Sequence, residues 1–578
     1  MTSSPLSIRR LTLPFDAIIA LPGSKSHANR AIIAACLAEG TTVLRNATPC
    51  DDVALLVQNI RRMGFDARWV DRKKGTLRIR GDMPKRKPKT TLFCGNAGTT
   101  LRFLVSLACL TPGEWTVTGD KRMLERPIKE LTAALKAIGA DIRDADGFPP
   151  LRIRGGNMRG GDVTLDASRS SQFLSSLLLI GSALDDGIRI RIASALASPS
   201  YIDLTERVIR DFGGTMKRDR GMFGVAPKIL RSTGTYDIEG DWSAAGAFLV
   251  LAELSGSNVR FGNLQGDSLQ GDRMLPQFIE KLRGEGERLI DCSSTPDQVM
   301  NLAVLAAHRN GETRITGAAN LRIKECDRLA VLREELGKTG IDIAEHPDGL
   351  IIRGRATLKP ALLRTKDDHR MAMCFAILGS LHADIRIDNP SCVSKSYPLF
   401  FKDLTNLKHS QRCIAIVGMR GAGKTHLGRC LASRLKMKHA DIDALFERAH
   451  GKIAAFVARH GWQAFRTEEE RLISLALRPG AVVSLGGGAV ECKRTRELLR
   501  TQALTVWLKV DESTLLTRLE LLKRPPLTSL PLKEEIHLIQ KKRTPLYQEV
   551  ADIVIPDDLP CSKHITHILS QLQKRCSW

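Results

Sequence analysis

The sequence repeats one local pattern along its first two thirds: an amphipathic helix, a glycine and a short strand. Helix-like segments at residues 52–60, 128–135 and 329–336 are each followed by a glycine and then by a short strand-like run. A repeated α/β unit cannot bury its apolar face alone, so its copies must pack against one another. The pattern therefore predicts an α/β protein with a symmetric, multi-lobed architecture. The chain has 578 residues, more than one compact domain holds, so further domains are expected.

A basic stretch at residues 21–30 separates a strand-like run at 17–21 from a helix-like run at 31–37. Its Pro-Gly pair ends the strand, and Lys25 and Arg30 then lie around the start of the helix. A helix N-terminus offers free N–H groups and a positive dipole, so this arrangement predicts an anion site. The alternative is a surface turn with ordinary basic residues.

More polar and basic residues stand at later strand–helix junctions, together with two isolated carboxylates. These stretches are 94–102, 119–127, 168–174, 198–201, 320–329, 368–373 and 394–395, and the carboxylates are Asp297 and Glu325. Singly, each stretch could be a loop or a helix cap. Together they supply the cations and hydroxyls that a site for two anionic substrates needs.

Taken together, these motifs resemble 5-enolpyruvylshikimate-3-phosphate (EPSP) synthase over residues 11–404, in the order of that family. The resemblance implies an N-terminal two-lobed enolpyruvyl transferase fold of repeated βαβαββ units, an inside-out α/β barrel, over residues 1–405. Lobe A would contain residues 21–238, and lobe B residues 1–20 and 239–405. The substrates would bind in the cleft between the lobes. The implied reaction moves the enolpyruvyl group of phosphoenolpyruvate to the 5-hydroxyl of shikimate 3-phosphate and releases phosphate, without a cofactor.

The same resemblance implies roles for individual residues. Asp297 would take the hydroxyl proton, Glu325 would protonate the methylene carbon, and Lys25 would touch both substrates. Shikimate 3-phosphate would contact Lys25, Ser26, Arg30, Ser170, Ser171, Gln172, Ser198, Asp297, Asn320 and Lys324. Phosphoenolpyruvate would contact Lys25, Gly98, Arg122, Gln172, Arg328, Arg370 and Lys395. The chain departs from the family at Phe103, where many members carry proline, at Trp242 and at His27.

A second phosphate-binding motif follows a short polar link at residues 406–411. A buried-strand pattern at 413–417 leads into Gly418-Met419-Arg420-Gly421-Ala422-Gly423-Lys424-Thr425, and a helix pattern follows. A strand before and a helix after G-x-x-x-x-G-K-[ST] form the context of a P-loop, which makes a chance glycine-rich turn the weaker interpretation. Lys424 would reach the terminal phosphates and Thr425 would bind Mg²⁺.

Later motifs at 441–443, 465–469, 484–489, 523–527 and 543–547 resemble shikimate kinase over residues 412–572, in a domain of residues 412–578 with a parallel sheet. The resemblance implies ATP and Mg²⁺ as cofactors. ATP would contact Gly421, Ala422, Gly423, Lys424, Thr425, His426 and Arg524. Shikimate would contact Asp443, Arg466, Gly487, Gly488 and Arg543, and the metal would contact Thr425 and Asp441.

Composition narrows the classes of partner. The formal net charge is +24, but aromatic residues are only 5%, whereas nucleic-acid modules usually combine basic and aromatic residues. The charge therefore favours small anionic substrates over nucleic acid. The 13 cysteines form no paired Cys-x-x-Cys motif, and no apolar run is long enough to cross a membrane. We expect reduced thiols and a cytoplasmic protein without a nucleic-acid or membrane partner; the sequence makes no prediction of oligomeric state.

The leading hypothesis is a bifunctional enzyme whose C-terminal kinase makes the substrate of its N-terminal transferase. The same order of domains occurs within the pentafunctional arom polypeptide, which this chain resembles over that portion only. One alternative is a UDP-N-acetylglucosamine enolpyruvyl transferase, against which the motifs at 170–172 and 324–328 argue. Another is a P-loop half that only binds nucleotide and regulates an active EPSP synthase. Binding of shikimate to the P-loop half would distinguish a shikimate kinase from a nucleotide-binding regulator, because a regulator needs no shikimate.

Overall fold

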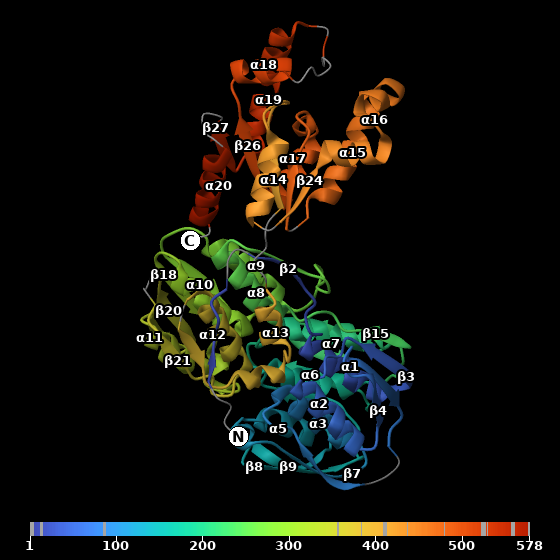
Figure 1. The fold of residues 1–578 in the computed structure, drawn as a ribbon. Coiled ribbons are helices and arrows are strands. Elements are labelled where there is room, and N and C mark those ends of the chain that lie inside the picture. Colours follow the sequence, from blue (N-terminus) through green and yellow to red (C-terminus); the bar gives the residue numbers. More distant parts are fainter. Residues whose placement is uncertain are drawn as a thin grey trace. The chain divides into compact units, whose positions relative to one another are not determined.

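The computed structural model describes residues 5–11, 15–84, 88–354, 358–382, 384–407, 413–435, 437–478, 480–521, 528, 530–556 and 561–575. The chain divides into two compact units (Figure 1). The first contains residues 1–11, 18–254 and 259–406, and the second contains residues 12–17, 255–258 and 407–578. The lobe and linker boundaries given above stay predictions.

The first unit contains three complete copies of a βαβαββ repeat, which confirms the predicted fold. The strand orders are β6-β7-β9-β8, β10-β11-β13-β12 and β17-β18-β20-β19; in each sheet the first two strands are parallel and the others antiparallel. The first copy contains β6 (Lys89–Phe93), α3 (Gly98–Leu110), β7 (Gly113–Thr118), α5 (Lys129–Ala137), β8 (Asp141–Ala145) and β9 (Phe148–Gly155). The second contains β10 (Gly161–Leu165), α6 (Ser171–Gly181), β11 (Ile188–Ile192), α7 (Ser200–Asp211), β12 (Met216–Asp219) and β13 (Met222–Val225). The third contains β17 (Arg288–Asp291), α10 (Val299–His308), β18 (Glu312–Thr316), α11 (Arg328–Lys338), β19 (Asp342–His346) and β20 (Gly349–Arg353).

One further sheet combines segments from both ends of predicted lobe A. β3 (Ala38–Arg45), β4 (Asp66–Asp71) and β5 (Thr76–Gly81) follow α1 (Lys25–Leu37), with α2 (Asp51–Arg62) between β3 and β4. β14 (Leu230–Arg231) and β15 (Thr235–Asp237) then pair in parallel with β3. The returning chain therefore supplies the first parallel strand of this copy. In lobe B, β22 (Ile385–Ile387) pairs with β1 (Leu6–Ser7) and β21 (Ala361–Leu363), and α12 (His369–Leu381) joins β21 to β22.

Helices α1, α3 and α6 form the centre of lobe A, and the sheets lie outside them. α3 is buried from Gly98 to Cys109, mostly with apolar side chains but with Arg102 and three hydroxyl residues among them. The sheets instead alternate: along β9, exposed and buried residues follow one another. The strands thus cover the buried helices with their apolar faces, which gives the inside-out arrangement. The remaining elements before residue 407 are β2 (Asp16–Ile19), α4 (Lys121–Leu124), α8 (Trp242–Ser255), β16 (Asn258–Phe261), η1 (Gly271–Met274), α9 (Leu275–Leu282), η2 (Pro296–Gln298), η3 (Ala319–Ile323), η4 (Pro390–Lys395) and α13 (Phe400–Thr405).

Two backbone segments connect the lobes, and they are hydrogen-bonded to each other. The N–H of Ser24 donates to the carbonyl of Glu239 at 2.8 Å, and the N–H of Asp241 donates to the carbonyl of Pro22 at 2.9 Å. Gly23 and Gly240 form an antiparallel bridge between these bonds. The chain therefore enters and leaves lobe A side by side.

The second unit is built on a five-stranded sheet with the order β24-β25-β23-β26-β27, and every pair in it is parallel, as predicted. The buried central strand β23 (Cys413–Val417) leads through the P-loop into α14 (Lys424–Leu435). The other strands are β24 (Lys438–Asp441), β25 (Ala481–Ser484), β26 (Ala503–Lys509) and β27 (Ile553–Pro556). The other helices are α15 (Ile442–His450), α16 (Ile453–Ala476), η5 (Ala489–Glu491), α17 (Lys493–Gln502), α18 (Glu512–Leu521), α19 (Leu532–Val550) and α20 (Cys561–Arg575). In the described part of the chain, no helix has the length and apolarity that a membrane span requires.

Candidate active sites

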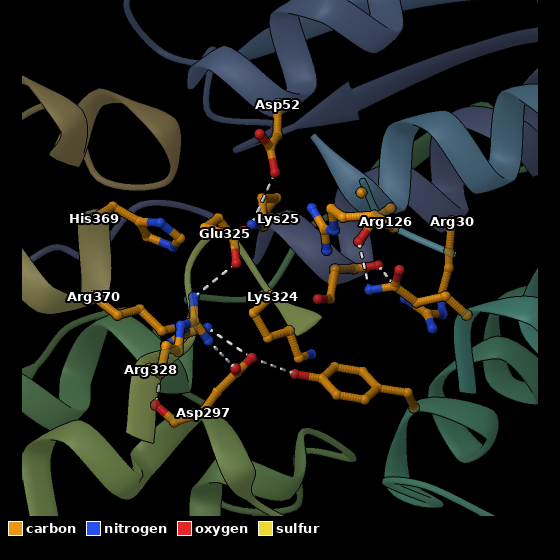
Figure 2. A pocket seen from close by; sticks show the side chains of 15 residues that line it. Lys25, Arg30, Asp52, Arg126, Asp297, Lys324, Glu325, Arg328, His369 and Arg370 are labelled. Atoms are coloured by element: carbon orange, nitrogen blue, oxygen red, sulfur yellow. Dashed lines mark hydrogen bonds and ion pairs between the residues drawn. The ribbon is translucent and has the colours of Figure 1, made fainter. Parts of the chain in front are cut away.

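A pocket in the first unit is lined by residues from both predicted lobes (Figure 2). Its lining is mainly charged. The lining residues are Lys25, Ser26, Arg30, Asp52, Gly98, Thr99, Arg126, Gln172, Tyr201, Asp297, Lys324, Glu325, Arg328, His369 and Arg370.

Six helices begin at this pocket, because each contributes a lining residue from its first two positions. They are α1, α3, α6, α7, α11 and α12. Side chains before these helices fix where some of them start: Ser170 accepts a hydrogen bond from the N–H of Gln172, and Asp368 accepts one from the N–H of Arg370. Because helix N-termini carry a positive dipole, the backbone itself makes the pocket attractive to anions.

Arg328 is the centre of an ion-pair cluster on the lobe B side (Figure 2). Its guanidinium lies 2.8 Å from Asp297, 3.0 Å from Glu325 and 2.8 Å from Asp368, and its side chain is only 2% exposed. Arg370 adds a second ion pair to Asp297, at 2.9 Å. One buried cation thus serves three carboxylates, and both predicted catalytic carboxylates belong to the cluster.

The protonation states of the two carboxylates follow from these neighbours. Burial would raise the pKa of Asp297, but Arg370, Lys324 and Arg328 outweigh burial and hold this pKa far below its usual value. Burial likewise would raise the pKa of Glu325, but Arg328, together with Lys395 and Arg126, lowers it well below the usual range. Without substrates, both groups are therefore ionised.

Asp52 joins the lysines of the two lobes. One of its oxygens lies 2.9 Å from Lys25 Nζ, and the other accepts a hydrogen bond from Lys395 Nζ at 2.8 Å. Lys395 also lies 3.7 Å from Glu325. Burial would lower the pKa of Lys25, but Asp52 and Glu325 raise it above the usual lysine value. Lys25 is therefore a fixed cation at the pocket.

Gly98 lies where two buried guanidinium groups meet. A Cβ atom at this position would be 2.5 Å from a terminal nitrogen of Arg126 and 2.6 Å from one of Arg102. Arg126 donates to the carbonyl and side-chain oxygens of Asn96, and Arg102 donates to Gln172 Oε1. In the described part of the chain, neither arginine forms an ion pair with a carboxylate. The two groups form a cationic cradle that a bound anion can neutralise.

The structure brings most predicted transferase residues to the pocket. The predicted residues in its lining are Lys25, Ser26, Arg30, Gly98, Gln172, Asp297, Lys324, Glu325, Arg328 and Arg370. The predicted residues outside the lining are Ser170, Ser171, Ser198, Asn320, Arg122 and Lys395. Arg122 donates to the carbonyls of Lys324 and Arg322 and pairs with Glu125, whereas Arg126, four residues later and beyond the end of α4, lines the pocket.

Sequence reasoning missed five lining residues: Asp52, Thr99, Arg126, Tyr201 and His369. Thr99 and His369 directly follow or precede a predicted residue, so adjacency could have found them. Asp52 was read only as part of a helix, and nothing in its neighbourhood signals that Lys25 and Lys395 flank it.

The kinase residues converge in the second unit. Thr425 Oγ1 donates to Asp441 Oδ2 at 2.5 Å, which places two oxygen ligands beside the P-loop. A Cβ atom on Gly488 would lie 2.1 Å from Arg466 and 2.9 Å from Arg543. One on Gly486 would lie 3.0 Å from Asp443.

The P-loop itself needs glycine. Gly421 and Gly423 have φ values of 81° and 95°, in the left-handed region that favours glycine. Ala422 between them is buried, and the side chain of His426 points to solvent as an exposed residue of α14. The predicted ATP contact Arg524 lies outside the described residues.

The two units define a class: a transferase with a pocket for anionic substrates, joined to a P-loop kinase. The EPSP synthase family model (3-phosphoshikimate 1-carboxyvinyltransferase) matches residues 12–404, and the shikimate kinase model matches residues 420–573. The chain belongs to the EPSP synthase family and carries a shikimate kinase domain, so two enzymes of the shikimate pathway are fused in it.

Individual relatives agree. The 3-phosphoshikimate 1-carboxyvinyltransferase of Tolumonas auensis is 35% identical over 418 residues, which cover 69% of this chain and 97% of that protein. The pentafunctional AROM polypeptide of Yarrowia lipolytica is 34% identical over 536 residues, which cover 83% of this chain but 34% of that protein. The solved EPSP synthase structure from Acinetobacter baumannii aligns with a TM-score of 0.58 at 26% identity, over 70% of this chain and 98% of that one.

Proposed function

We propose that the second unit phosphorylates the 3-hydroxyl of shikimate with ATP, and that the first transfers the enolpyruvyl group of phosphoenolpyruvate to the 5-hydroxyl of the product. The observation that carries the proposal is the pocket at which six helix N-termini meet a set of fixed cations. Both substrates of the transfer are small polyanions, and a charge-assisted hydrogen bond is worth about 1.5–3 kcal/mol. We further propose that the enzyme works in the cytoplasm, on small molecules, because its cysteine usage predicts reduced thiols.

Two groups of pocket residues support two subsites. Shikimate 3-phosphate is held by the helix starts of lobe A and by the neighbouring polar residues Lys25, Ser26, Arg30, Ser170, Ser171, Gln172, Ser198, Asn320 and Lys324. Phosphoenolpyruvate is held by Lys25, Gly98, Arg328, Arg370 and Lys395. Arg126 takes the role predicted for Arg122 in this second subsite, because Arg126 lines the pocket while Arg122 donates to backbone carbonyls.

Substrate binding changes the protonation of the carboxylates. When the phosphate and carboxylate of phosphoenolpyruvate engage Arg126, Arg328 and Lys395, these cations stabilise the Glu325 anion less, so the pKa of Glu325 rises. Glu325 can then hold the proton that the methylene carbon needs. Asp297 remains beside Arg370 and accepts the proton of the 5-hydroxyl.

The transfer is an addition followed by an elimination. The 5-oxygen bonds to C2 of phosphoenolpyruvate as its proton passes to Asp297, while the methylene carbon gains a proton from Glu325. The C2–O bond to phosphate then breaks, phosphate leaves with the proton that Asp297 took, and the new methyl group returns a proton to Glu325, which restores the double bond. Two carboxylates in different surroundings can divide the acid and base roles in this way.

In the kinase unit, Thr425 and Asp441 would hold Mg²⁺, because a hydroxyl and a carboxylate oxygen lie together there and Mg²⁺ prefers oxygen ligands. The ion would neutralise phosphate charge. The P-loop backbone with Lys424 would bind ATP, with Arg524 as a further contact, and Asp443, Arg466, Gly487, Gly488 and Arg543 would hold shikimate.

One assay tests both activities: purified protein with Mg²⁺, ATP, shikimate and phosphoenolpyruvate, with ADP and phosphate followed separately. We expect both products, and phosphate only when ATP and phosphoenolpyruvate are present. Glu325→Gln should lower phosphate release by about 100-fold or more and leave ADP formation intact, whereas Glu334→Gln, a change on the exposed face of α11, should affect neither. ADP without phosphate in the wild type would refute the transferase proposal. Phosphate from added shikimate 3-phosphate, without any ADP from shikimate, would instead make the P-loop unit a regulatory module.

A further inference from the structure

We propose that Phe103, a residue that does not line the pocket, is a positioning residue for shikimate 3-phosphate because its ring holds the guanidinium of Arg30. This inference rests on the proposed function of the same pocket. The ring is 1% exposed, so it acts on the ligand only through Arg30.

Arg30 is a buried cation with no counter-ion among the described residues. It is 1% exposed, and its nitrogens donate to three neutral acceptors: Nε to Thr205 at 2.8 Å, and the two terminal nitrogens to the carbonyl of Ser26 at 2.8 Å and to Ser175 at 3.0 Å. No carboxylate in the described part of the chain forms an ion pair with it. Burial lowers the pKa of Arg30 to about 10, which leaves it charged at neutral pH.

Two aromatic rings form cation–π contacts with the guanidinium of Arg30. The guanidinium carbon lies 5.3 Å from the ring centre of Phe103 on α3 and 5.5 Å from that of Tyr201 on α7. The negative face of an aromatic ring attracts a cation within about 6 Å, and this attraction is stronger where water is excluded. The rings thus stabilise a charge that its hydrogen-bond partners alone do not neutralise.

The contacts of Arg30 leave donors for a ligand. A guanidinium carries five N–H groups, and three are engaged in the bonds above. Because Arg30 lines the pocket beside Ser26, the other two are available to an anionic oxygen of the ligand. Their direction depends on the orientation of the guanidinium, which the Phe103 ring helps to hold through its contact at 5.3 Å, together with the three hydrogen bonds.

Of the two rings, Phe103 gives the cleaner test. The hydroxyl of Tyr201 donates to Asp297 at 3.4 Å, so a change there would also disturb the proposed base. Phe103 has no polar atom and lies outside the pocket lining. Phe103→Leu removes the ring and keeps an apolar side chain.

The experiment measures the binding of shikimate 3-phosphate alone by calorimetry, and then the steady-state kinetics. For Phe103→Leu we expect binding to weaken about 3- to 30-fold, the range that a buried cation–π contact supports. KM for shikimate 3-phosphate should rise in parallel, while kcat and KM for phosphoenolpyruvate stay within about twofold. Phe103→Tyr, which retains the ring, should bind within about twofold of the wild type.

Two controls separate positioning from packing. Phe65→Leu makes the same change at a 3% exposed ring in the same core, and it should leave binding unchanged. In a double-mutant cycle, Phe103→Leu should have no further effect once Arg30→Gln is present. If Phe103→Leu does not fold, Phe103→Met replaces it in the same measurements. Equal losses in the Phe65 variant, an additive cycle, or unchanged binding overturns the proposal; a wild type that fails to bind shikimate 3-phosphate overturns the proposed function instead.

Discussion

Gly98 keeps open the space between two buried arginines at the edge of the pocket. The two guanidinium groups beside it form no ion pair with a carboxylate in the described part of the chain, so they are free to bind an anion. The anion can reach them because Gly98 has no side chain. The residue opens α3, and its backbone N–H is therefore also available to the ligand. The hydrogen atom of Gly98, in place of a methyl group, therefore leaves the space beside Arg126 and Arg102 open to a ligand.

Gly98→Ala should weaken phosphoenolpyruvate binding selectively. Because the new methyl group would lie 2.5 Å from Arg126 and 2.6 Å from Arg102, those side chains must move out of the cradle. We expect KM for phosphoenolpyruvate to rise about tenfold or more, which corresponds to the loss of one charge-assisted contact. KM for shikimate 3-phosphate should change less than threefold. Gly337→Ala, on a helix with open space around it, is the matched control and should change neither constant. Equal changes in both constants would contradict a local effect at Gly98.

At the scale of elements, a polar network ties α1 to the chain that returns from lobe A. His27 Nε2 on α1 lies 2.9 Å from the hydroxyl of Tyr236 on β15, and that hydroxyl donates to Asp211 at the end of α7 at 2.9 Å. Because Lys25 and Ser26 precede His27 on the same helix, the network holds the helix start that contributes these two residues to the pocket. Burial, with Arg30 and Arg207, lowers the pKa of His27 to about 3.

This histidine should make stability depend on pH. An unfolded histidine takes up a proton near pH 6.5, whereas folded His27 stays neutral down to about pH 3. The unfolded state therefore binds more protons as pH falls below 6.5, and the free energy of unfolding decreases by up to about 1.4 kcal/mol per pH unit. We expect wild type to lose stability relative to His27→Gln between pH 6.5 and 4, in urea titrations that follow the transferase unit.

The difference in stability between wild type and His27→Gln isolates the contribution of His27 from that of other titrating groups. Burial raises the pKa of Asp272 to about 6 and also raises that of Glu239, so these acids stabilise the fold at low pH, but both proteins share them. The exposed His346 provides a control substitution, His346→Gln, at a histidine outside this network. A His27 variant with the same pH dependence as the wild type would contradict the interpretation.

The sequence predicted elements and helix starts better than the direction of side chains. A strand, a Pro-Gly break and basic residues located α1, and the repeat located α2, α5 and α11, because these signals are local. Arg122 and Arg126 lie four residues apart and carry the same charge, and only tertiary packing directs Arg126 to Gly98 and Arg122 to the carbonyls of η3. Asp52 and Tyr201 were missed for the same reason: their partners Lys395 and Asp297 lie far away in the sequence.

At the scale of the whole molecule, two active sites should work independently within one chain. Lys424→Met removes the lysine of the P-loop and should abolish ADP formation, yet leave the conversion of added shikimate 3-phosphate unchanged. Mixing this variant with Glu325→Gln should restore phosphate release from shikimate after a lag, because each supplies the step that the other lacks. The same mixture without ATP is the control. If each variant keeps its remaining activity but the mixture stays inactive, the intermediate does not pass between molecules, contrary to this expectation.

The paired crossing at Gly23 and Gly240 also limits how the transferase can move. Two separate tethers would let one lobe swing, slide and twist against the other. Here the bonds from Ser24 to Glu239 and from Asp241 to Pro22 fasten the two strands together, so neither can advance along the other without breaking both. Sliding and twisting of the two segments against each other are therefore restricted. The bonded pair keeps the start of α1 and the start of α8, which directly follow the two segments, in one register.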